Sequence, residues 1–216
     1  MILCDIGNTN YHFFYKNQDL KIPVRKKPQL NEFSPKELNC IFYISVNAEA
    51  EKMLIKYNPC VNLAQYIELE SDYDLDELGA DRAFACLSIE DGVIIDAGSA
   101  ITIDLVEKGK HKGGYIFPGM QSYQKALSGA SKVLNKPLNF GTDLSILPTN
   151  TIDAMSAAFI QSITLLVQSI AKDKKIYITG GDGKFFSVVL PNSIYDKFLI
   201  FRGMQKIVET NKLLDK

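Results

Sequence analysis

The sequence predicts an α/β fold made of two related halves, and three observations support this prediction. An apolar run that ends in Asp-x-Gly occurs at Ile2–Gly7 and again at Val93–Gly98. A second apolar run and a charged turn follow each copy, which is the pattern of a β-hairpin with Asp-x-Gly at its tip. Strand–helix patterns then follow each hairpin, so we predict two subdomains, residues 1–90 and 91–216. One such turn is common for local reasons, but two at equivalent places indicate an internal repeat.

The first half continues with a strand over residues 11–15 and a short third strand over residues 19–24. Ser34 followed by Pro35 favours a helix start, because Ser is a preferred N-cap and Pro fits the first helical position. The remaining predicted elements of this half are a strand (41–46), a helix (48–57), a loop with a strand (60–69), an acidic loop (72–77) and a short helix that opens at Gly79 and ends at Gly92.

The second half begins with a buried strand, Val93–Ile95, whose β-branched residues are typical of a central strand. A second strand is predicted over residues 101–106. The segments that follow are a glycine-containing stretch (113–119), a helix interrupted at Ser128-Gly129 (120–134), a long helix capped by Asn150-Thr151 (152–171), a strand (175–179), a glycine turn (180–183), a helical turn (185–190), an apolar segment (198–201) and a terminal helix after Gly203.

Composition limits the possible functions. The 216 residues are 46% hydrophobic and 23% charged, with a net charge of -1, so charge gives no case for binding nucleic acid or an anionic membrane. Four cysteines without CxxC spacing predict free thiols in a reducing, cytoplasmic environment. With only two histidines, a zinc site or a His-based triad is disfavoured, and His12 and His111 are assigned structural roles. The helix over 152–171 contains polar residues that we expect to keep it out of a bilayer.

Charged and small residues gather near the end of the second central strand. Asp81 and Arg82 open the helix before this strand, and Asp96 and the Gly98-Ser99 turn follow it. Ligands of open α/β sheets bind at the carboxyl ends of the strands. A phosphate site needs backbone N–H donors, small residues for close approach and carboxylates to hold a metal ion. These residues therefore predict a phosphate-binding site.

Paired Asp-x-Gly hairpins at the head of two related halves resemble the actin-like ATPase superfamily, which includes sugar and acetate kinases, Hsp70 chaperones and actin. Within it, the chain resembles type III pantothenate kinases from its first strand to its last helix. The resemblance implies two actin-like (ribonuclease H-like) subdomains with an active-site cleft between them. It also implies ATP-dependent phosphorylation of pantothenate to 4′-phosphopantothenate, the first step of coenzyme A biosynthesis. The motifs that support it are Asp5-Ile6-Gly7-Asn8-Thr9-Asn10, Gly79-Ala80-Asp81-Arg82, Asp96-Ala97-Gly98-Ser99, Gly113-Gly114 with Pro118-Gly119, and Thr179-Gly180-Gly181.

The resemblance implies roles for the ATP-binding residues. Asp5 holds Mg²⁺ through water, and Asp96 lies at a site for K⁺ or NH₄⁺. The phosphates are bound by the two turns, namely Asp5, Ile6, Gly7, Asn8, Thr9 and Asn10 in the first half and Gly98 and Ser99 in the second. Alternatively, Asp5 has no role in binding, and its side chain only stabilises its own turn by a hydrogen bond to the backbone.

The resemblance also implies the substrate-binding residues, which are Gly79, Ala80, Asp81, Arg82, Thr151 and Tyr73. Asp81 is the general base, Arg82 pairs with the pantothenate carboxylate, and Thr151 reaches the substrate across the interface of a homodimer. Each has a local alternative. Asp81 could be present only because the helix dipole favours an acidic residue at the helix N-terminus. Arg82 could form a surface ion pair with the acidic loop, and Thr151 could be a helix N-cap.

Two other functions stay open at this stage. One is a non-catalytic, nucleotide-binding regulator of the same fold, since a fold alone does not determine function. The other is a related small-molecule kinase or phosphohydrolase with a different substrate. The presence of Asp5, Asp81, Arg82 and Asp96 together favours the enzyme, and the Gly79–Arg82 motif favours pantothenate.

Overall fold

The computed structural model describes residues 1–28 and 40–214, and its contacts divide the chain into two compact units. The predicted helix start at Ser34 lies outside the described residues. The division runs between Glu90 and Asp91, but the tip of a later hairpin and the C-terminal segment belong with the first residues. Unit 1 comprises Met1–Glu90, Val106–Gly113 and Phe198–Lys216, and unit 2 comprises Asp91–Leu105 and Gly114–Lys197.

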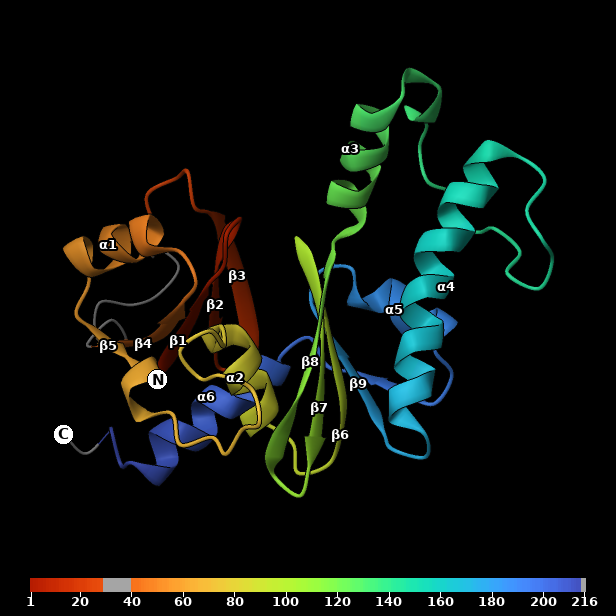
Figure 1. The fold of residues 1–216 in the computed structure, drawn as a ribbon. Coiled ribbons are helices and arrows are strands. Elements are labelled where there is room, and N and C mark those ends of the chain that lie inside the picture. The colour runs from red at the N-terminus through yellow and green to blue at the C-terminus, as the bar shows by residue number, and fades with distance from the viewer. Residues whose placement is uncertain (29–39, 215–216) are drawn as a thin grey trace. The chain divides into compact units, whose positions relative to one another are not determined.

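Unit 1 contains a mixed sheet and its helices (Figure 1). The strands are β1 (Ile2–Ile6), β2 (Asn10–Tyr15), β3 (Gln18–Pro23), β4 (Ile41–Ser45) and β5 (Cys60–Asn62), and the helices are α1 (Ala48–Tyr57), the 3₁₀ helix η1 (Leu63–Tyr66), α2 (Ala80–Leu87) and α6 (Leu199–Thr210). The strand order is β3-β2-β1-β4-β5. The central strand β1 is antiparallel to β2 and parallel to β4.

Side chains from both faces of the unit 1 sheet are buried. On one face the Tyr11 hydroxyl donates to the carbonyl oxygen of Ala50 in α1, at 2.9 Å. On the other face Phe14 stacks on Phe201 of α6, with ring centroids 5.2 Å apart. His12 contacts Phe201 edge-on at 4.9 Å, which agrees with the structural role predicted for this histidine.

Helix α6 begins earlier than the sequence suggested. The sequence interpretation places the terminal helix only after Gly203, and glycine is in general a poor helix former. In the structure Gly203 lies inside α6, where a Cβ atom would come within 1.9 Å of the backbone oxygen of Phe84 in α2. The close approach of α6 to α2 therefore explains the glycine, and it outweighs the helix propensity.

Unit 2 contains a second mixed sheet with helices alongside it (Figure 1). Its strands are β6 (Gly92–Ala97), β7 (Ala100–Glu107), β8 (Lys110–Pro118), β9 (Ile176–Thr179) and β10 (Ser193–Tyr195), and its helices are α3 (Met120–Ala130), the 3₁₀ helix η2 (Lys132–Leu134), α4 (Thr151–Ala171) and α5 (Gly183–Val189). The tip of the β7–β8 hairpin belongs to unit 1. Strands β8 and β10 were not predicted, since β8 starts with Lys110-His111-Lys112-Gly113 and β10 is only 3 residues long.

The two sheets have the same topology, which confirms the predicted internal repeat and the α/β fold class. The order β10-β9-β6-β7-β8 in unit 2 is the order of unit 1 with β6, β7 and β8 in place of β1, β2 and β3. The central strand β6 is parallel to β9, as β1 is to β4. Each Asp-x-Gly turn therefore follows the central strand of its own sheet.

Helix α4 packs in the core of unit 2, where Phe159, Ile163 and Val167 are buried with strand residues of the sheet. By length and composition alone this helix could cross a membrane, with a mean hydropathy of 1.5. The expectation that its polar residues exclude this on composition is therefore wrong. Half of its apolar stretch is buried inside the protein, as in the core helix of a globular domain.

All four cysteines are free thiols, as predicted. Cys4 and Cys86 are buried, whereas Cys40 and Cys60 are partly buried. Burial raises the pKa of the Cys4 thiol well above its ordinary value and the pKa of Cys60 to about 12. These two thiols are therefore protonated at neutral pH and unreactive as nucleophiles.

Candidate active site

The first predicted phosphate turn joins β1 to β2 in unit 1. Asp5 is partly buried near the end of β1, and the carbonyl oxygen of Ile6 accepts the Val46 N–H at 3.0 Å. The Gly7 N–H donates to the carbonyl oxygen of Asn10 at 3.0 Å, which closes the turn. Between them Asn8 is exposed to solvent, and so is Thr9. The turn thus presents small polar residues and a carboxylate at the end of a central strand.

The second predicted phosphate turn joins β6 to β7 in unit 2. Asp96 is partly buried in β6, and Ser99 is exposed in the turn. The Gly98 N–H donates to the carbonyl oxygen of Ala100 at 2.9 Å, so this turn is one residue shorter than the first. The carbonyl oxygen of Ser99 accepts the Gly119 N–H at 3.1 Å.

Two further glycines lie against this second turn. A Cβ atom on Gly119 would come within 2.2 Å of the Gly98 oxygen. Gly180 has φ +88°, and a Cβ atom there would come within 2.4 Å of both the Ala97 oxygen and Asp96 Oδ1. Since each of these glycines would place a Cβ atom against backbone oxygens, only glycine fits at either position. Gly119 and Gly180, which belong to the glycine stretches singled out in the sequence, therefore pack directly on the Asp96 turn.

Asp81 lies in the first turn of α2, after the N-cap Gly79 and the first helical residue Ala80. Its Oδ1 accepts the Arg82 N–H at 2.8 Å. A Cβ atom on Gly79 would come within 2.6 Å of the same Oδ1, so glycine at this position leaves room for the carboxylate. The position at a helix N-terminus stabilises the negative charge of the carboxylate, which makes it a weaker base, so a role as base would depend on its geometry.

Arg82 and Tyr73 are brought together in unit 1. Arg82 is only 5% exposed, and its guanidinium carbon lies 4.8 Å from the centroid of the Tyr73 ring. This is the geometry of a cation–π contact. The Arg82 guanidinium is therefore not at the surface. In the acidic loop just upstream, Asp72 pairs with Lys110 at 2.6 Å, and also with Lys112.

Thr151 is the first residue of α4 and is partly buried. The N-cap is Asn150, whose side-chain oxygen accepts the Asp153 N–H at 3.0 Å. The predicted cap at this helix start is thus confirmed for Asn150, whereas the alternative of Thr151 as the N-cap is wrong.

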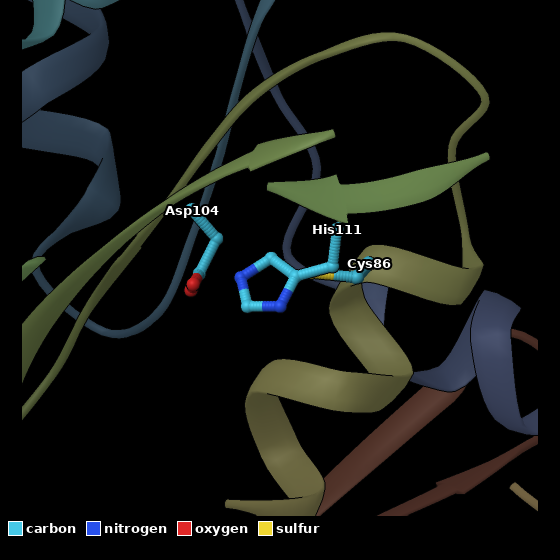
Figure 2. A group of neighbouring side chains, drawn as sticks. All are labelled: Cys86, Asp104 and His111. Atoms are coloured by element: carbon cyan, nitrogen blue, oxygen red, sulfur yellow. The ribbon is translucent and has the colours of Figure 1, made fainter. Parts of the chain in front are cut away.

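His111 is a residue that the sequence interpretation did not connect with the site. It is fully buried, and its Nδ1 lies 2.9 Å from Ser71 Oγ. Its ring lies 5.9 Å from the Tyr73 ring. Figure 2 shows the side chains of His111 and Cys86 side by side, with Asp104 on the neighbouring strand of the β7–β8 hairpin. No sequence signal links His111 to Tyr73, because their proximity depends on a pairing between distant segments.

The sequence matches known proteins over nearly its full length. The family model described as type III pantothenate kinase matches residues 1–173. A type III pantothenate kinase from Helicobacter hepaticus is 48% identical over 210 residues, which cover 97% of this chain and 98% of that protein.

The fold also matches solved structures. A Campylobacter jejuni protein, described as a conserved protein assigned to the Baf family of transcriptional activators, has a TM-score of 0.84 at 40% identity, covering 98% of this chain and 99% of that one. The ethanolamine utilization protein EutJ from Carboxydothermus hydrogenoformans has a TM-score of 0.51 at 17% identity, covering 94% and 87%. The latter likeness concerns the fold alone, which is of the actin-like ATPase type. With the family model and a full-length relative in agreement, the chain belongs to the type III pantothenate kinase family.

Proposed function

We propose that Asp81 is the general base of this kinase and that Arg82 and Tyr73 hold its substrate. Membership of the family gives the activity, which is phosphorylation of pantothenate by ATP in the first step of coenzyme A biosynthesis. The observation that carries the assignment of residues is the buried Arg82 guanidinium, 4.8 Å from the Tyr73 ring and next in sequence to Asp81.

The chemistry of pantothenate suits this arrangement. Pantothenate carries one carboxylate, and a guanidinium binds a carboxylate through two parallel hydrogen bonds. The aromatic ring limits the directions in which Arg82 can point, so the substrate's carboxylate has a defined partner. This fixed orientation matters because phosphoryl transfer depends mainly on positioning and charge stabilisation.

In the proposed step the primary hydroxyl of pantothenate attacks the γ-phosphorus of ATP. The hydroxyl proton passes to an oxygen of Asp81, the bond between the γ-phosphorus and the bridging oxygen breaks, and ADP leaves. A positioned general base contributes about 10²–10⁴ in rate. Gly79 supports this role, since a side chain there would meet the Asp81 carboxylate.

For ATP binding, we assign the first turn to the phosphates and to Mg²⁺. The partly buried Asp5 supplies a carboxylate, the ligand type that Mg²⁺ prefers, beside the exposed Asn8 and Thr9. A bound Mg²⁺ would neutralise phosphate charge. For unit 2 we assign phosphate contacts to Gly98 and Ser99, and K⁺ or NH₄⁺ binding to Asp96, whose carboxylate lies against the backbone of Gly180.

We further propose that the protein is a cytoplasmic homodimer, with Thr151 contributing to the pantothenate site of the partner. In support, α4 begins at Thr151 and leaves Leu165 62% exposed, and the loop before it leaves Leu147 88% exposed. Contiguous exposed apolar surface marks contact sites, and in the proposed dimer these two side chains would form part of such a surface. The net charge of -1 gives no reason to expect nucleic acid or an anionic membrane as partner.

A coupled assay of ADP release tests the proposal, with pantothenate and MgATP in K⁺ or Na⁺ buffer. We expect turnover that requires pantothenate, is higher in K⁺, and falls by about 10²–10⁴ in Asp81→Asn. Wild-type turnover in Asp81→Asn would exclude Asp81 as base. Folded wild-type protein without pantothenate-dependent ADP release would instead favour a non-catalytic nucleotide-binding regulator.

A further inference from the structure

We infer that Ser71 and His111 are positioning residues for pantothenate, because they hold Tyr73 in place under the Arg82 guanidinium. The inference rests on the proposed role of Tyr73 and Arg82 in substrate binding. All of the residues involved belong to unit 1. Tyr73 lies in a loop outside any helix or strand, so its position depends on contacts made by its neighbours.

The first contact is a backbone pairing between the loop and β8. Ser71 and His111 form an isolated parallel bridge. The His111 N–H donates to the carbonyl oxygen of Glu70 at 2.9 Å, and the Asp72 N–H donates to the carbonyl oxygen of His111 at 2.9 Å. The strand thus holds the loop on both sides of Ser71, immediately before Tyr73.

The second contact runs through the Ser71 hydroxyl. Ser71 Oγ accepts the backbone N–H of Tyr73 at 2.9 Å and lies 2.9 Å from His111 Nδ1. One oxygen therefore connects the backbone of Tyr73 to the imidazole. Because His111 is fully buried, and buried polar atoms need hydrogen-bond partners, this connection restricts the ring of His111 as well as the loop.

The third contact is between the rings. The imidazole of His111 lies 5.9 Å from the Tyr73 ring, at an interplanar angle of 39°. The Arg82 guanidinium carbon lies 4.8 Å from the same Tyr73 ring. The Tyr73 ring therefore contacts both His111 and Arg82, and a shift of His111 or Ser71 would move the surface on which the guanidinium lies.

Exposed ion pairs also stabilise the backbone pairing between this loop and β8. Lys110 and Lys112 flank His111 in β8, and both pair with Asp72, which lies between Ser71 and Tyr73. Lys110 also lies 3.3 Å from Glu70. These charges are exposed and contribute less than the buried contacts, since surface ion pairs are weak. The buried Ser71–His111 contact is consequently the part to test.

The test is to measure steady-state kinetics of the full-length protein carrying Ser71→Ala. Loss of one hydrogen-bonding hydroxyl should raise the KM for pantothenate by about 3- to 10-fold. We expect the KM for ATP to stay close to wild type, the melting temperature to fall by a few degrees because a buried hydrogen bond is lost, and Ser71→Thr to restore both the KM for pantothenate and the melting temperature. His111→Asn keeps a polar atom near the position of Nδ1 and should stay closer to wild type than His111→Phe.

Ser193→Ala is the matched control, because the hydroxyl of Ser193 donates to a carbonyl oxygen in unit 2 and should leave both KM values unchanged. Calorimetric titration of pantothenate into Ser71→Ala should show the same weakening without depending on catalysis. Unchanged pantothenate affinity in Ser71→Ala would overturn the inference, as would an equal rise in both KM values. Neither result would affect the assignment of Asp81, which the Asp81→Asn assay tests separately.

Discussion

The two Asp-x-Gly turns follow equivalent strands, yet they differ in what surrounds them. A Cβ atom on Gly7 of the first turn would meet only the Asn10 oxygen, at an ordinary 3.7 Å. The second turn is contacted by the backbone at Gly119 and Gly180, both at distances that no side chain could occupy. The backbone of the first turn is instead held by the Val24 N–H, which donates to the carbonyl oxygen of Thr9 at 3.0 Å. The repeat therefore gave both halves the same strand order but different neighbours at the turn.

This difference suggests different tasks for the two halves. In unit 2, two further segments of backbone, at Gly119 and Gly180, pack against the Asp96 turn and restrict its shape. In unit 1, the tight backbone contact is at the helix pair, where Gly203 of α6 meets Phe84 of α2. Helix α2 is also the element that carries Asp81 and Arg82. The rigid part of unit 1 thus positions the proposed substrate residues.

The largest loss of stability should come from Gly180→Ala, which disrupts the close packing of Gly180 on the Asp96 turn. The new Cβ would clash with the Ala97 oxygen, and φ +88° is strained for any residue with a side chain. We expect a loss of about 2–4 kcal/mol in stability, measured by denaturant unfolding. Gly181→Ala is the control, because its Cβ would meet nothing within 4 Å. Equal unfolding midpoints for the two variants would contradict the conclusion that close packing of Gly180 on the Asp96 turn stabilises the protein.

A similar loss is expected in unit 1 from Gly203→Ala, which would push α6 away from α2. A Cβ atom 1.9 Å from the Phe84 oxygen cannot be accommodated without movement of a helix. We predict a loss of about 2–3 kcal/mol in stability together with reduced kcat. Gly129→Ala in α3 is the control and should have the opposite effect on stability. A Cβ atom there would meet nothing within 4 Å, and alanine has the higher helix propensity, so we expect the protein to be stabilised by about 0.5–1 kcal/mol. A stable, fully active Gly203→Ala protein would show that the helix contact is not required.

Gly79→Ala should separate activity from stability. The added methyl group would displace the carboxylate of Asp81, which lies at the end of a flexible side chain and can move at little cost. We predict that kcat falls by about 10- to 100-fold, since small misplacements of a catalytic group are costly. The free energy of unfolding should change by less than about 1 kcal/mol. If kcat is unchanged, Asp81 does not act as the base from this position.

The sequence was sufficient for the repeat, for the Asp-x-Gly turns and for most helices, because these depend on local patterns. Strand β8 was missed because its first residues, Lys110 to Gly114, lack an apolar run, and its pairing with Ser71 joins residues 40 positions apart. The roles of Gly180 and Gly203 also depend on close approaches between distant segments. For the same reason His111 was assigned only a structural role, although it contacts both Ser71 and Tyr73.

The smallest predicted effect concerns the charges that flank this pairing. Hydrogen bonds from Lys110 and Lys112 lower the pKa of Asp72 from 3.8 to about 2. A carboxyl group whose pKa is lower in the folded state stabilises the protein above its unfolded pKa, and this contribution is lost as pH falls from 3.8 to about 2. In thermal unfolding, wild type should therefore be slightly more stable than Asp72→Asn at pH above about 4, and the two should converge near pH 2. High salt should also reduce the difference, because the pairs are exposed. A difference that persists unchanged at pH 2 would mean that Asp72 contributes through its shape and hydrogen bonding, and not through its charge.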